Sequence, residues 1–424
     1  MPLELQMSSS DSREVAGGKG PRDMTSRRKK LEVALLTGGR DAPYAYGIVT
    51  ELSAREIQLE VIGGDSVDFP EFHSSRFIRF LNLRGDQSRN AGFGRKLVRV
   101  LAYYARLLRY AAAAKPKIFH ILWNNKFEIF DRTLLLLYYR LLGKKIVLTA
   151  HNVNAGWRDA NDSLINRLSL RAQYGLADHI FVHTEKMKRE LVAAFSMDSQ
   201  AISVIPFGIN NSLKITNLSY TEARERLGLA DQEKAVLFFG NIAPYKGLDV
   251  LVKAFLSMAP ANPDLRLIIV GAPRPGCEGY WREIEQSIRL HGLAGRVILR
   301  ICYIPDEETE LYFKAADVAV LPYRIIFQSG VLFLAYSFGL PVIATDVGEL
   351  GDDIVPGETG FLCRPDLPDA LVEAIQKYFQ SNLYRDLESR RKDIREFALA
   401  RHSWELVGQK TQEVYLDLLG ERPA

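Results

Sequence analysis

Short apolar runs alternate with longer amphipathic segments along most of the chain. The first run, residues 31–37, ends at two glycines and is followed by an amphipathic segment (47–55) and a second run (59–62). Apolar runs of this length are typical of strands that are buried on both faces of a sheet. The order of strand, glycine loop, helix and strand therefore predicts a parallel α/β sheet.

The alternation continues in two series that are separated by a polar, asparagine-rich segment. The first series predicts strands at residues 118–122, 145–149, 179–183 and 201–205, with helices at 164–175 and 185–195. The second predicts strands at residues 235–239, 265–270, 297–301, 318–321 and 341–345, with helices at 248–258, 280–291 and 307–316, and residues 367–419 helical throughout. We therefore predict two Rossmann-like, doubly wound domains, 31–206 and 221–396, joined by a linker at 207–220.

Composition places the chain among ordinary globular proteins. Hydrophobic residues make up 47% and charged residues 25% of 424 residues, a length that suits two domains. The net charge of +4 is too small to indicate nucleic-acid binding. Three widely spaced cysteines predict reduced thiols in a cytosolic protein rather than a zinc site.

Targeting signals are not evident in the sequence. The apolar runs are shorter than the ~18–20 residues that span a bilayer. Residues 1–30 lack the apolar centre of a secretory signal and are predicted to form a disordered tail that ends in a basic cluster.

Two loops of the second series carry residues that suit a phosphate group. In the first, a strand ends at Gly240, Asn241 follows, and Lys246 precedes a helix that opens at Gly247. Glycine lets a phosphate approach the backbone, and the lysine adds a positive charge. Taken alone, this loop is equally compatible with an ordinary strand–helix turn and a solvated lysine.

The second loop precedes a helix at residues 330–338. Ser329 is a good N-cap residue, and the free amides of Gly330 and Val331 behind it suit a diphosphate. An ordinary capped helix is the competing interpretation. Because ligands of open parallel sheets bind at the carboxyl ends of the strands, both loops point to a nucleotide-type ligand.

Together these segments resemble the nucleotide-sugar-binding domain of retaining glycosyltransferases with the GT-B fold, in particular glycosyltransferase family four. Residues 238–255 (FFGNIAPYKGLDVLVKAF), 317–350 and 355–365 (VPGETGFLCRP) carry the resemblance. The N-terminal half matches through residues 37–39, 148–153 and 204–210. The resemblance implies two domains facing across a cleft, with a C-terminal helix (397–424) packing back toward the first domain.

The resemblance also implies roles for individual residues. Lys246 would hold the donor diphosphate and His151 would contact the donor sugar, which makes these two the candidate catalytic residues. The other candidate donor-binding residues are Gly38, Gly39, Gly240, Asn241, Tyr303, Ile304, Gln328, Ser329, Gly330 and Val331. His151 is also compatible with a buried position at a strand end, and His183, in a similar setting, is assigned no function.

The chain departs from the family pattern at several positions. Many members carry two glutamates eight positions apart, where this chain has Ile326 and Leu334. Many also carry an arginine where Asn241 or Ala243 stands here, and Gln328 could replace one polar contact. These departures keep open a catalytically silent scaffold or nucleotide-sugar-binding protein. An epimerase of the same fold would need cleft carboxylates that we cannot place.

Retaining transfer in this fold is thought to need no dedicated nucleophile, since the departing phosphate can accept the acceptor's proton. The protein then acts by positioning and by stabilising the leaving diphosphate. The sequence shows no DxD pair that would hold Mg²⁺, so we expect no metal requirement and a nucleoside-diphosphate sugar as co-substrate. We expect transfer of a hexosyl unit to a glycan or lipid-linked acceptor, in cell-surface polysaccharide or glycolipid synthesis.

A basic stretch marks the first domain. Eleven Lys and Arg residues lie between positions 76 and 117, opposed only by Asp86. In a helix predicted at 93–114, one face would carry Arg95, Arg99, Arg106 and Arg109, and the other Leu97, Leu101, Tyr104 and Leu108. The arginine face, flanked by Phe80, Phe93 and Tyr110, suits an anionic membrane surface or a lipid-diphosphate acceptor. A core-packed helix with a solvated basic face is the alternative, and nucleic acid is not favoured. The expected location is cytoplasmic or peripheral on the inner face of the cytoplasmic membrane.

Overall fold

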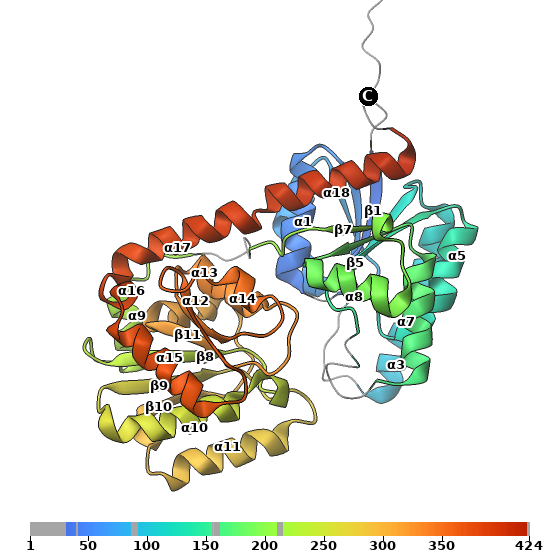
Figure 1. Cartoon of the computed structure of the whole chain (residues 1–424). Helices are drawn as coiled ribbons and strands as arrows, with labels where there is room; N and C mark the ends of the chain where they lie inside the picture. The colour runs from blue at the N-terminus through green and yellow to red at the C-terminus, as the bar shows by residue number, and fades with distance from the viewer. Residues whose placement is uncertain are drawn as a thin grey trace, which may run out of the picture. The chain divides into compact units, whose positions relative to one another are not determined.

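The computed structural model describes residues 31–39, 41–85, 92–154, 156, 162–209 and 215–421. Within this part of the chain, the strands form a seven-stranded and a six-stranded sheet, both built from parallel pairs (Figure 1). The predicted α/β fold with two doubly wound sheets is therefore confirmed. The predicted tail and residues 210–214 of the predicted linker lie outside the described residues, and the domain boundaries stay predictions.

The first sheet has the order β3-β2-β1-β4-β5-β6-β7. Strands are added on one side of β1 and then, from β4 onward, on the other, which is the topology that places a ligand where the order reverses. The strands are β1 (Glu32–Leu36), β2 (Gln58–Gly63), β3 (Ile78–Asn82), β4 (Ile118–Ile121), β5 (Lys145–Ala150), β6 (His179–Val182) and β7 (Ile202–Val204).

Helices cover both faces of this sheet. Val33 and Leu35 of β1 lie in one apolar cluster with α1 and the C-terminal helix α18 (Trp404–Leu419), whereas Ala34 and Leu36 lie in another with α3, α5 and α7. Because successive strand residues point to opposite faces, a run that is apolar throughout needs a helix layer on each side. The helices are α1 (Ala42–Ala54), α2 (Pro70–Ser74), α3 (Phe93–Ala113), α4 (Glu128–Phe130), a π-helical turn (Asp131–Leu135), α5 (Leu136–Leu141), α7 (Leu164–Leu176) and α8 (Glu185–Phe195), with 3-10 turns at Asp65–Val67 and Ser199–Ala201.

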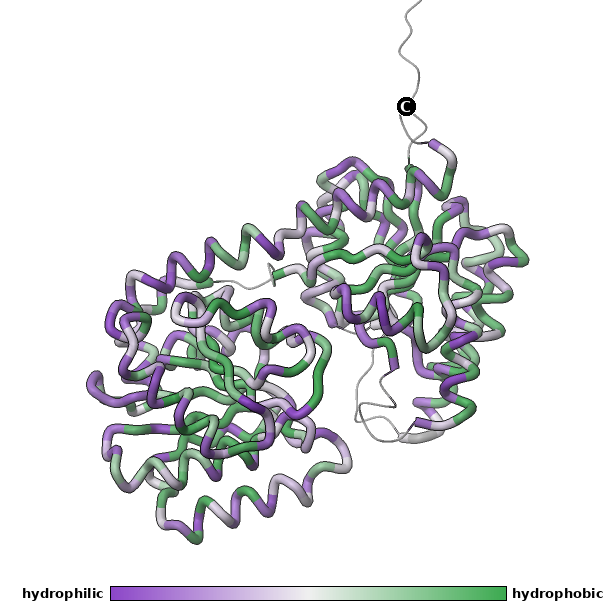
Figure 2. The backbone as a smooth tube through the Cα atoms, in the orientation of Figure 1, coloured by the Kyte–Doolittle hydropathy of each residue, from purple (hydrophilic) through white to green (hydrophobic). Residues whose placement is uncertain are grey.

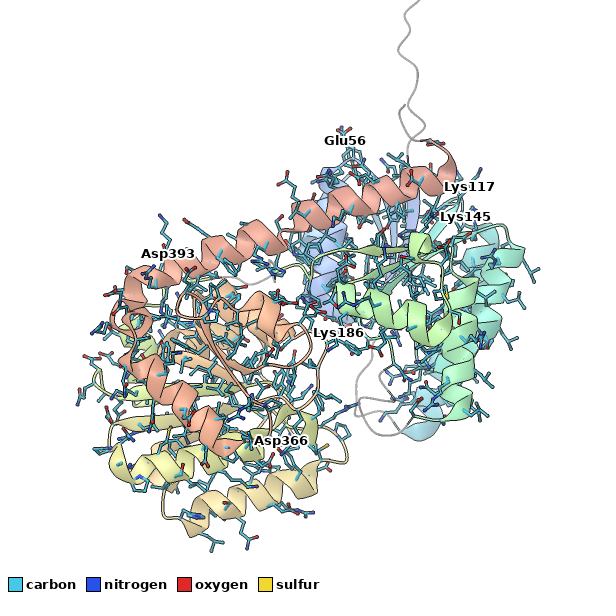
Figure 3. All side chains as sticks on the ribbon, viewed as in Figure 1. Glu56, Lys117, Lys145, Lys186, Asp366 and Asp393 are labelled. Carbon is cyan, nitrogen blue, oxygen red and sulfur yellow. The ribbon has the colours of Figure 1, made fainter. Side chains whose placement is uncertain are left out.

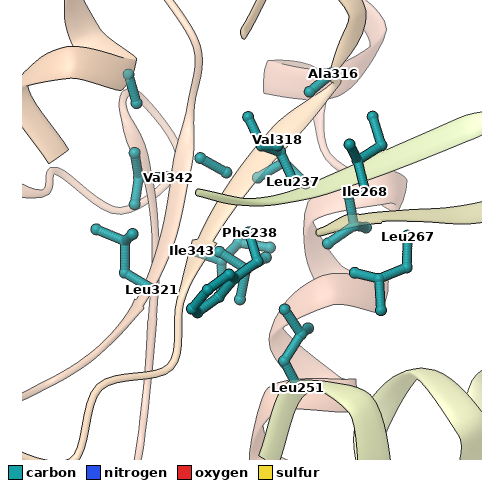
Figure 4. Packing of buried hydrophobic residues seen from close by; sticks show 14 of the residues in the cluster. Leu237, Phe238, Leu251, Leu267, Ile268, Ala316, Val318, Leu321, Val342 and Ile343 are labelled. Carbon is teal, nitrogen blue, oxygen red and sulfur yellow. The ribbon is translucent and has the colours of Figure 1, made fainter. Parts of the chain in front are cut away.

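The second sheet has the order β10-β9-β8-β11-β12-β13, again with a reversal next to its first strand. Its core is made by the apolar central strands and the helices that pack on them. Figure 4 shows Phe238 of the first strand and Leu267 of the next strand on the same side as Leu251 of the helix between them. The strands are β8 (Lys234–Phe239), β9 (Leu265–Val270), β10 (Val297–Arg300), β11 (Val318–Leu321), β12 (Val342–Thr345) and β13 (Gly360–Cys363).

One helix of this second part of the chain precedes its first strand, and the others lie between its strands and after them. They are α9 (Tyr220–Leu227), α10 (Leu248–Met258), α11 (Glu278–Leu290), α12 (Asp306–Ala315), α13 (Gly330–Ser337), α14 (Leu350–Asp353) and α15 (Pro368–Gln380), with 3-10 turns at Pro244–Lys246, Ala259–Ala261 and Ala294–Arg296. The predicted strands and helices of both series are confirmed to within two residues. The helix predicted at 47–55 is the exception, because it begins at Ala42, where the carboxylate of Asp41 accepts the Tyr44 N–H at 3.2 Å.

The C-terminal region is helical, as predicted, but it is not one helix. It comprises α15, α16 (Asn382–Arg385), α17 (Leu387–His402) and α18 (Trp404–Leu419). Ser381 and Ser403 interrupt it, since each side chain caps the helix that follows. α17 packs on α13 of the second sheet, whereas α18 packs on α1 of the first (Figure 1). The chain therefore crosses back to the first sheet at its end, as expected.

Two strands were not predicted, and each lies at the edge of its sheet. β3 borders only β2, and β13 borders only β12. β3 is not fully buried at any position, and β13 starts with Gly360, so neither gives a clear apolar run. An edge strand has a partner on one side only, which weakens the sequence pattern that identifies it.

Charged residues mark the starts of strands in the first sheet. Lys117 and Lys145, labelled in Figure 3, stand at the beginnings of β4 and β5, and the Lys145 N–H donates to the Lys117 carbonyl oxygen at 2.7 Å. The opposite, carboxyl ends of these strands carry the residues described in the next section.

A buried histidine in the first sheet predicts acid sensitivity. His120 is fully buried between the Tyr415 hydroxyl (2.6 Å) and Thr149 Oγ1 (2.8 Å). Burial, assisted by the charge of His179, lowers the pKa of His120 to about 3. The unfolded chain, with a histidine pKa near 6.5, then binds the proton that the folded chain refuses, so stability is complete above pH 6.5 and falls as the pH drops toward 3.

We expect His120 to contribute about 1.4 kcal/mol per pH unit to this loss below pH 6. The measurement is urea unfolding of the wild type and H120N between pH 7 and pH 4.5. The variant should show the shallower dependence on pH, whatever its stability at pH 7. Equal slopes for the two proteins would contradict the prediction.

Candidate functional site

The loop after β8 places Lys246 at the carboxyl end of the second sheet. The lysine side chain is only 8% exposed, and its Nζ lies 5.4 Å from the centre of the Tyr323 ring. Gly240, at the end of β8, has φ +107°, and a Cβ there would lie 2.9 Å from Nζ. The glycine therefore leaves room for the ammonium group and has a backbone conformation that other residues rarely adopt.

An arginine fixes the loop that carries Lys246. Arg324, just after β11, donates to both carboxylate oxygens of Asp249 at 2.8 Å and to the Pro244 carbonyl oxygen at 2.6 Å. The Tyr280 hydroxyl also donates to Asp249. Burial opposes ionisation of Asp249, but the hydrogen bonds from Arg324 and Tyr280 outweigh it and lower the pKa of Asp249. Arg324 thus links the start of the turn, at Pro244, to the first turn of α10, at Asp249, through charged hydrogen bonds.

The N-terminus of α13 lies beside this loop. A Cβ on Gly240 would lie 3.5 Å from Cγ2 of Val331, the second residue of α13. The first amides of a helix have no acceptor within the helix and carry the positive end of its dipole. Lys246 and the start of α13 therefore converge on one space that suits an anion, as the sequence indicated.

Ser329 does not cap α13 as predicted. Its side chain makes no capping hydrogen bond, and the buried Oγ lies 3.4 Å from the Tyr323 hydroxyl instead. The Ser329 hydroxyl therefore faces Tyr323, whose ring also lies next to the Lys246 ammonium group. Ser329 and Tyr323 therefore lie next to the candidate anion site, and the amides of Gly330 and Val331 stay its candidate donors.

Gln328 and the two apolar positions near α13 face other groups. The Gln328 Nε2 donates to the Asp353 carboxylate at 3.3 Å, and its Oε1 is buried without a hydrogen-bond partner among the described residues. Ile326 and Leu334 pack, partly buried, against the core of the second sheet. These apolar side chains cannot supply the hydrogen bonds that glutamates, expected at these positions from the family resemblance, would supply.

The residues suggested for the base pocket are not gathered in one polar site. Tyr303 is 75% exposed, whereas the Ile304 side chain is buried in the core of the second sheet. Asn241 is exposed next to Gly240. A contact of Ile304 with a base would therefore have to involve its backbone.

On the first sheet, Gly38 and Gly39 form a tight turn after β1. Both have left-handed backbone conformations, with φ +60° and +65°. A Cβ on Gly38 would lie 2.6 Å from the Trp123 carbonyl oxygen, and one on Gly39 would lie 2.4 Å from the Arg84 guanidinium. The turn thus needs glycine at both positions. No spacing in the sequence pairs this turn with Trp123 or Arg84, which follow other strands.

His151 lies among aromatic rings at the end of β5. Its ring stacks on Trp123 with centres 4.0 Å apart and planes 4° apart, and Tyr44 approaches edge-on. Its Nδ1 lies 2.9 Å from Nε2 of His183. Burial lowers the pKa of His151 well below its usual value and that of His183 to about 4. Both rings are therefore neutral at pH 7 and can exchange hydrogen bonds with a ligand or each other, but neither can act as a general acid there.

His183 was assigned no function from the sequence, yet it is the hydrogen-bond partner of His151. Its Nδ1 also lies 3.4 Å from the Ile205 carbonyl oxygen. The two histidines are 32 positions apart and meet because β5 and β6 are neighbours in the sheet. A pair of strand-end histidines on adjacent strands was the signal that could have revealed this.

A cavity of about 490 Å³ opens beside His151 at the ends of β4 and β5. Many of its side chains are amides, and the Asn124 Nδ2 donates to the Gln173 Oε1 at 3.2 Å. Amides donate and accept hydrogen bonds, as the hydroxyls of a sugar or polyol require. The polar residues lining this polar cavity include Asn124, Glu128, Arg132, His151, Asn152, Asn166 and Gln173.

The basic helix α3 is only partly packed as predicted. Arg95, Arg106 and Arg109 are exposed and Arg99 is half-buried. The packed stripe is Tyr103, Tyr104, Leu107 and Ala111, whereas Leu97, Val98 and Leu101 in the first half are exposed. The alternative of a core-packed helix therefore holds for the second half of α3 but not for the first, where these apolar side chains are exposed. Asp86, Arg89 and the Phe93 side chain lie outside the described residues.

The described part of the chain was searched for metal-ligand clusters and for membrane-spanning helices. Within it, three or more His, Cys, Asp or Glu side chains do not gather as a metal site would require. The thiols of Cys277, Cys302 and Cys363 are free. None of the helices described is both long and apolar enough to cross a bilayer.

Two family models match the chain. Residues 233–381 match the model described as "Glycosyl transferases group 1", and residues 42–213 match "Glycosyltransferase Family 4". The two matches together cover every strand of the second sheet and every strand of the first except β1, and they include the loops of Lys246, α13 and His151.

Curated relatives match over part of their length. A D-inositol 3-phosphate glycosyltransferase of Corynebacterium diphtheriae is 28% identical over 64% of this chain and 65% of its own. The enzyme of the same name from Nocardia farcinica is 31% identical over 52% of this chain and 50% of its own. The match thus spans between half and two thirds of these relatives.

Solved structures match nearly the whole chain in fold. Sucrose-phosphate synthase from Thermosynechococcus elongatus superimposes with a TM-score of 0.72 at 21% identity, over 93% of this chain and 100% of its own. Anabaena Alr3699/HepE, solved with UDP and glucose, superimposes with a TM-score of 0.70 at 17% identity, over 91% of this chain and 100% of its own. At these identities the likeness establishes the fold alone.

Proposed function

Because the chain is a glycosyltransferase of the group 1, family 4 type with the GT-B fold, we propose that it transfers a hexosyl unit from a nucleoside-diphosphate sugar to a glycan or lipid-linked acceptor. The observation that carries the proposal is the convergence of Lys246, Gly240 and the start of α13 on one anion-binding space. This space would hold the donor diphosphate.

On the donor side, two kinds of positive charge would replace a metal ion. The buried ammonium group of Lys246 would neutralise the phosphate oxygens from one side, and the amides of Gly330 and Val331 from the other. Both are held in place before the donor binds, so they stabilise the charge that builds up on the leaving diphosphate without reorganisation. The Asp249–Arg324 network keeps Lys246 at its position.

The reaction we propose proceeds with retention of configuration. The bond between the anomeric carbon and the phosphate oxygen breaks, and the acceptor oxygen bonds to the same face of the anomeric carbon. The acceptor's proton passes to the departing phosphate oxygen, so no protein nucleophile is needed. His151, neutral and fixed by Trp123 and His183, would orient the donor sugar by hydrogen bonds.

The acceptor would bind on the first sheet. The polar cavity beside His151 offers amide groups that suit a hydroxyl-rich molecule, and the turn of Gly38 and Gly39 lies near the Trp123 backbone that borders the cavity. The curated relatives named D-inositol 3-phosphate glycosyltransferases support a hydroxyl-bearing acceptor in general. The neighbour solved with UDP makes UDP-sugars the first donors to test.

The experiment is a transfer assay in EDTA with UDP-, GDP-, ADP- and dTDP-hexoses and a set of alkyl and oligosaccharide acceptors. We expect one donor to yield a product, and proton NMR of that product to show the anomeric configuration of the donor. An inverted product would contradict retention, and activity only with added Mg²⁺ would contradict metal independence.

A second function is favoured by the apolar side chains at Ile326 and Leu334, which pack against the core. A protein that binds a nucleotide sugar without transferring it would fit these two positions. Donor binding without product for every acceptor, in the same assay, would support that function instead.

A further inference from the structure

An apolar groove adjoins the polar cavity on the first sheet. It has a volume of about 720 Å³ and lies between residues 126–134 and the start of α7. Leu134 is 61% exposed and Ile165 is 63% exposed. Apolar residues that are scattered singly over a surface are ordinary, but large apolar side chains gathered in one open groove indicate a binding surface. The apolar residues lining the groove are Phe127, Ile129, Phe130, Leu134 and Ile165.

The groove and the polar cavity share a wall. Glu128, Arg132 and Asn166 line both. Arg132 donates to the Asn166 Oδ1 at 2.8 Å and to the Glu128 carboxylate at 2.6 Å. These hydrogen bonds fix the three side chains as a polar border. A molecule that fills the cavity and extends beyond it therefore passes directly from amide groups to apolar side chains.

Exposed apolar residues continue from the groove along its neighbouring helices. The Phe127 ring stacks on Tyr104 of α3 with centres 5.4 Å apart, and Leu101, one turn earlier on α3, is exposed. Leu164 and Leu168 of α7 are exposed as well. The hydropathy colouring of Figure 2 shows apolar residues interspersed along these helices. Exposed apolar residues are thus present on both helices next to the groove.

We propose that the groove binds the apolar chain of an amphiphilic acceptor whose hydroxyl-rich head occupies the polar cavity. The inference rests on the proposed function, since it names the class of acceptor for that transfer. A free glycan, which has no apolar chain, would leave the groove unoccupied. Docking on a bilayer would explain the exposed leucines but not the wall that the groove shares with the head cavity.

The test compares paired ligands with the same sugar head. Methyl and dodecyl glycosides of glucose, galactose, mannose and maltose are titrated into the protein by calorimetry, with the dodecyl members below their critical micelle concentrations. For at least one pair we expect the dodecyl member to bind at least tenfold tighter. L134S and I165S should each reduce that gain at least fivefold and leave the methyl member unchanged. Both residues are largely exposed, so the fold should persist, as thermal unfolding will check.

Two further variants separate head from chain. N124A removes an amide from the cavity and should weaken both members of a pair by the same factor. L290S removes a leucine of α11 that is 76% exposed but lies far along the chain, on the second sheet, and should behave as the wild type. Loss of the chain-dependent gain in L290S would overturn the assignment to the groove.

Three other results would overturn the proposal. The first is equal affinity of the wild type for both members of every pair, and the second is an unchanged gain in L134S and I165S. The third concerns acceptor-free vesicles of 3:1 phosphatidylcholine and phosphatidylglycerol. If L134S and I165S lose binding to these vesicles but keep the gain for dodecyl glycosides, the surface binds a bilayer instead.

UDP binding, measured in parallel on the wild type and K246A, tests the donor site by itself. Its failure would contradict the proposed function without affecting the chain-dependent gain.

Discussion

Replacing Lys246 by alanine is expected to lower kcat/KM for transfer by about 10²–10³, the size of effect seen when one preorganised donor to a developing charge is removed. The ammonium group is buried at the end of the second sheet, beside the start of α13. Its loss leaves the amides of Gly330 and Val331 to hold the diphosphate alone. The measurement is initial rate against donor concentration, with the acceptor saturating.

A matched control lies on the following helix. Lys253 of α10 is well exposed, and its Nζ lies 3.9 Å from the Asp249 carboxylate. K253A changes the net charge by the same amount but should leave kcat/KM within about twofold, since exposed ion pairs contribute little. Equal losses in K246A and K253A would show that general positive charge, rather than the Lys246 site, carries the effect.

Replacing Trp404 by alanine is expected to lower the stability of the first sheet by about 3–5 kcal/mol. The indole begins α18, donates its N–H to the Ile209 carbonyl oxygen at 2.6 Å, and meets Tyr44 edge-on at 5.0 Å. Gly47 and Gly208 leave room for the indole ring, because a Cβ on either residue would lie within 2.4 Å of a ring atom. The substitution would leave a large cavity and an unpaired carbonyl group in the core of α1 and α18.

Hydrogen exchange measures the local stability of each sheet separately. A separate measurement is needed because a chain with two cores need not unfold in one step. In W404A the amides of β1 and β2 should lose protection, while those of β8 and β9 keep it. L399A, at an exposed position of α17, should change neither by more than about 0.5 kcal/mol. Unchanged protection of β1 in W404A would contradict the packing of α18 on the first sheet.

The sequence predicted those parts of the fold that leave a local pattern. Central strands are apolar at every position because helices cover both faces, so runs such as 265–270 and 318–321 were assigned with their observed bounds. β3 and β13 were missed because edge strands have a weaker pattern. On α3, periodicity could not show which helix turns would find a packing partner, so the exposure of Leu97 and Leu101 was not foreseen.

In the candidate site too, residues that are close in the sequence could be predicted, whereas contacts between distant segments could not. Gly240, Lys246 and Gly247 lie within one loop, so the sequence could suggest an anion site there, and the family resemblance favoured that interpretation over an ordinary turn. Tyr323 under the lysine and Trp123 on His151 come from other strand ends, and only the strand order brings them together. The missed cap of Ser329 has a similar cause, since its hydroxyl turns to Tyr323. Side chains that meet across a sheet edge leave no spacing in the sequence.

In the proposed mechanism, Lys246 and the start of α13 hold the donor diphosphate without a metal ion. The most direct test is a crystal structure of the protein with UDP, or whichever nucleoside diphosphate binds most tightly, grown in EDTA. We expect the β-phosphate to lie within hydrogen-bond distance of Lys246 Nζ and of the amides of Gly330 and Val331. A diphosphate bound elsewhere, or bound only with Mg²⁺ between it and the protein, would contradict the account.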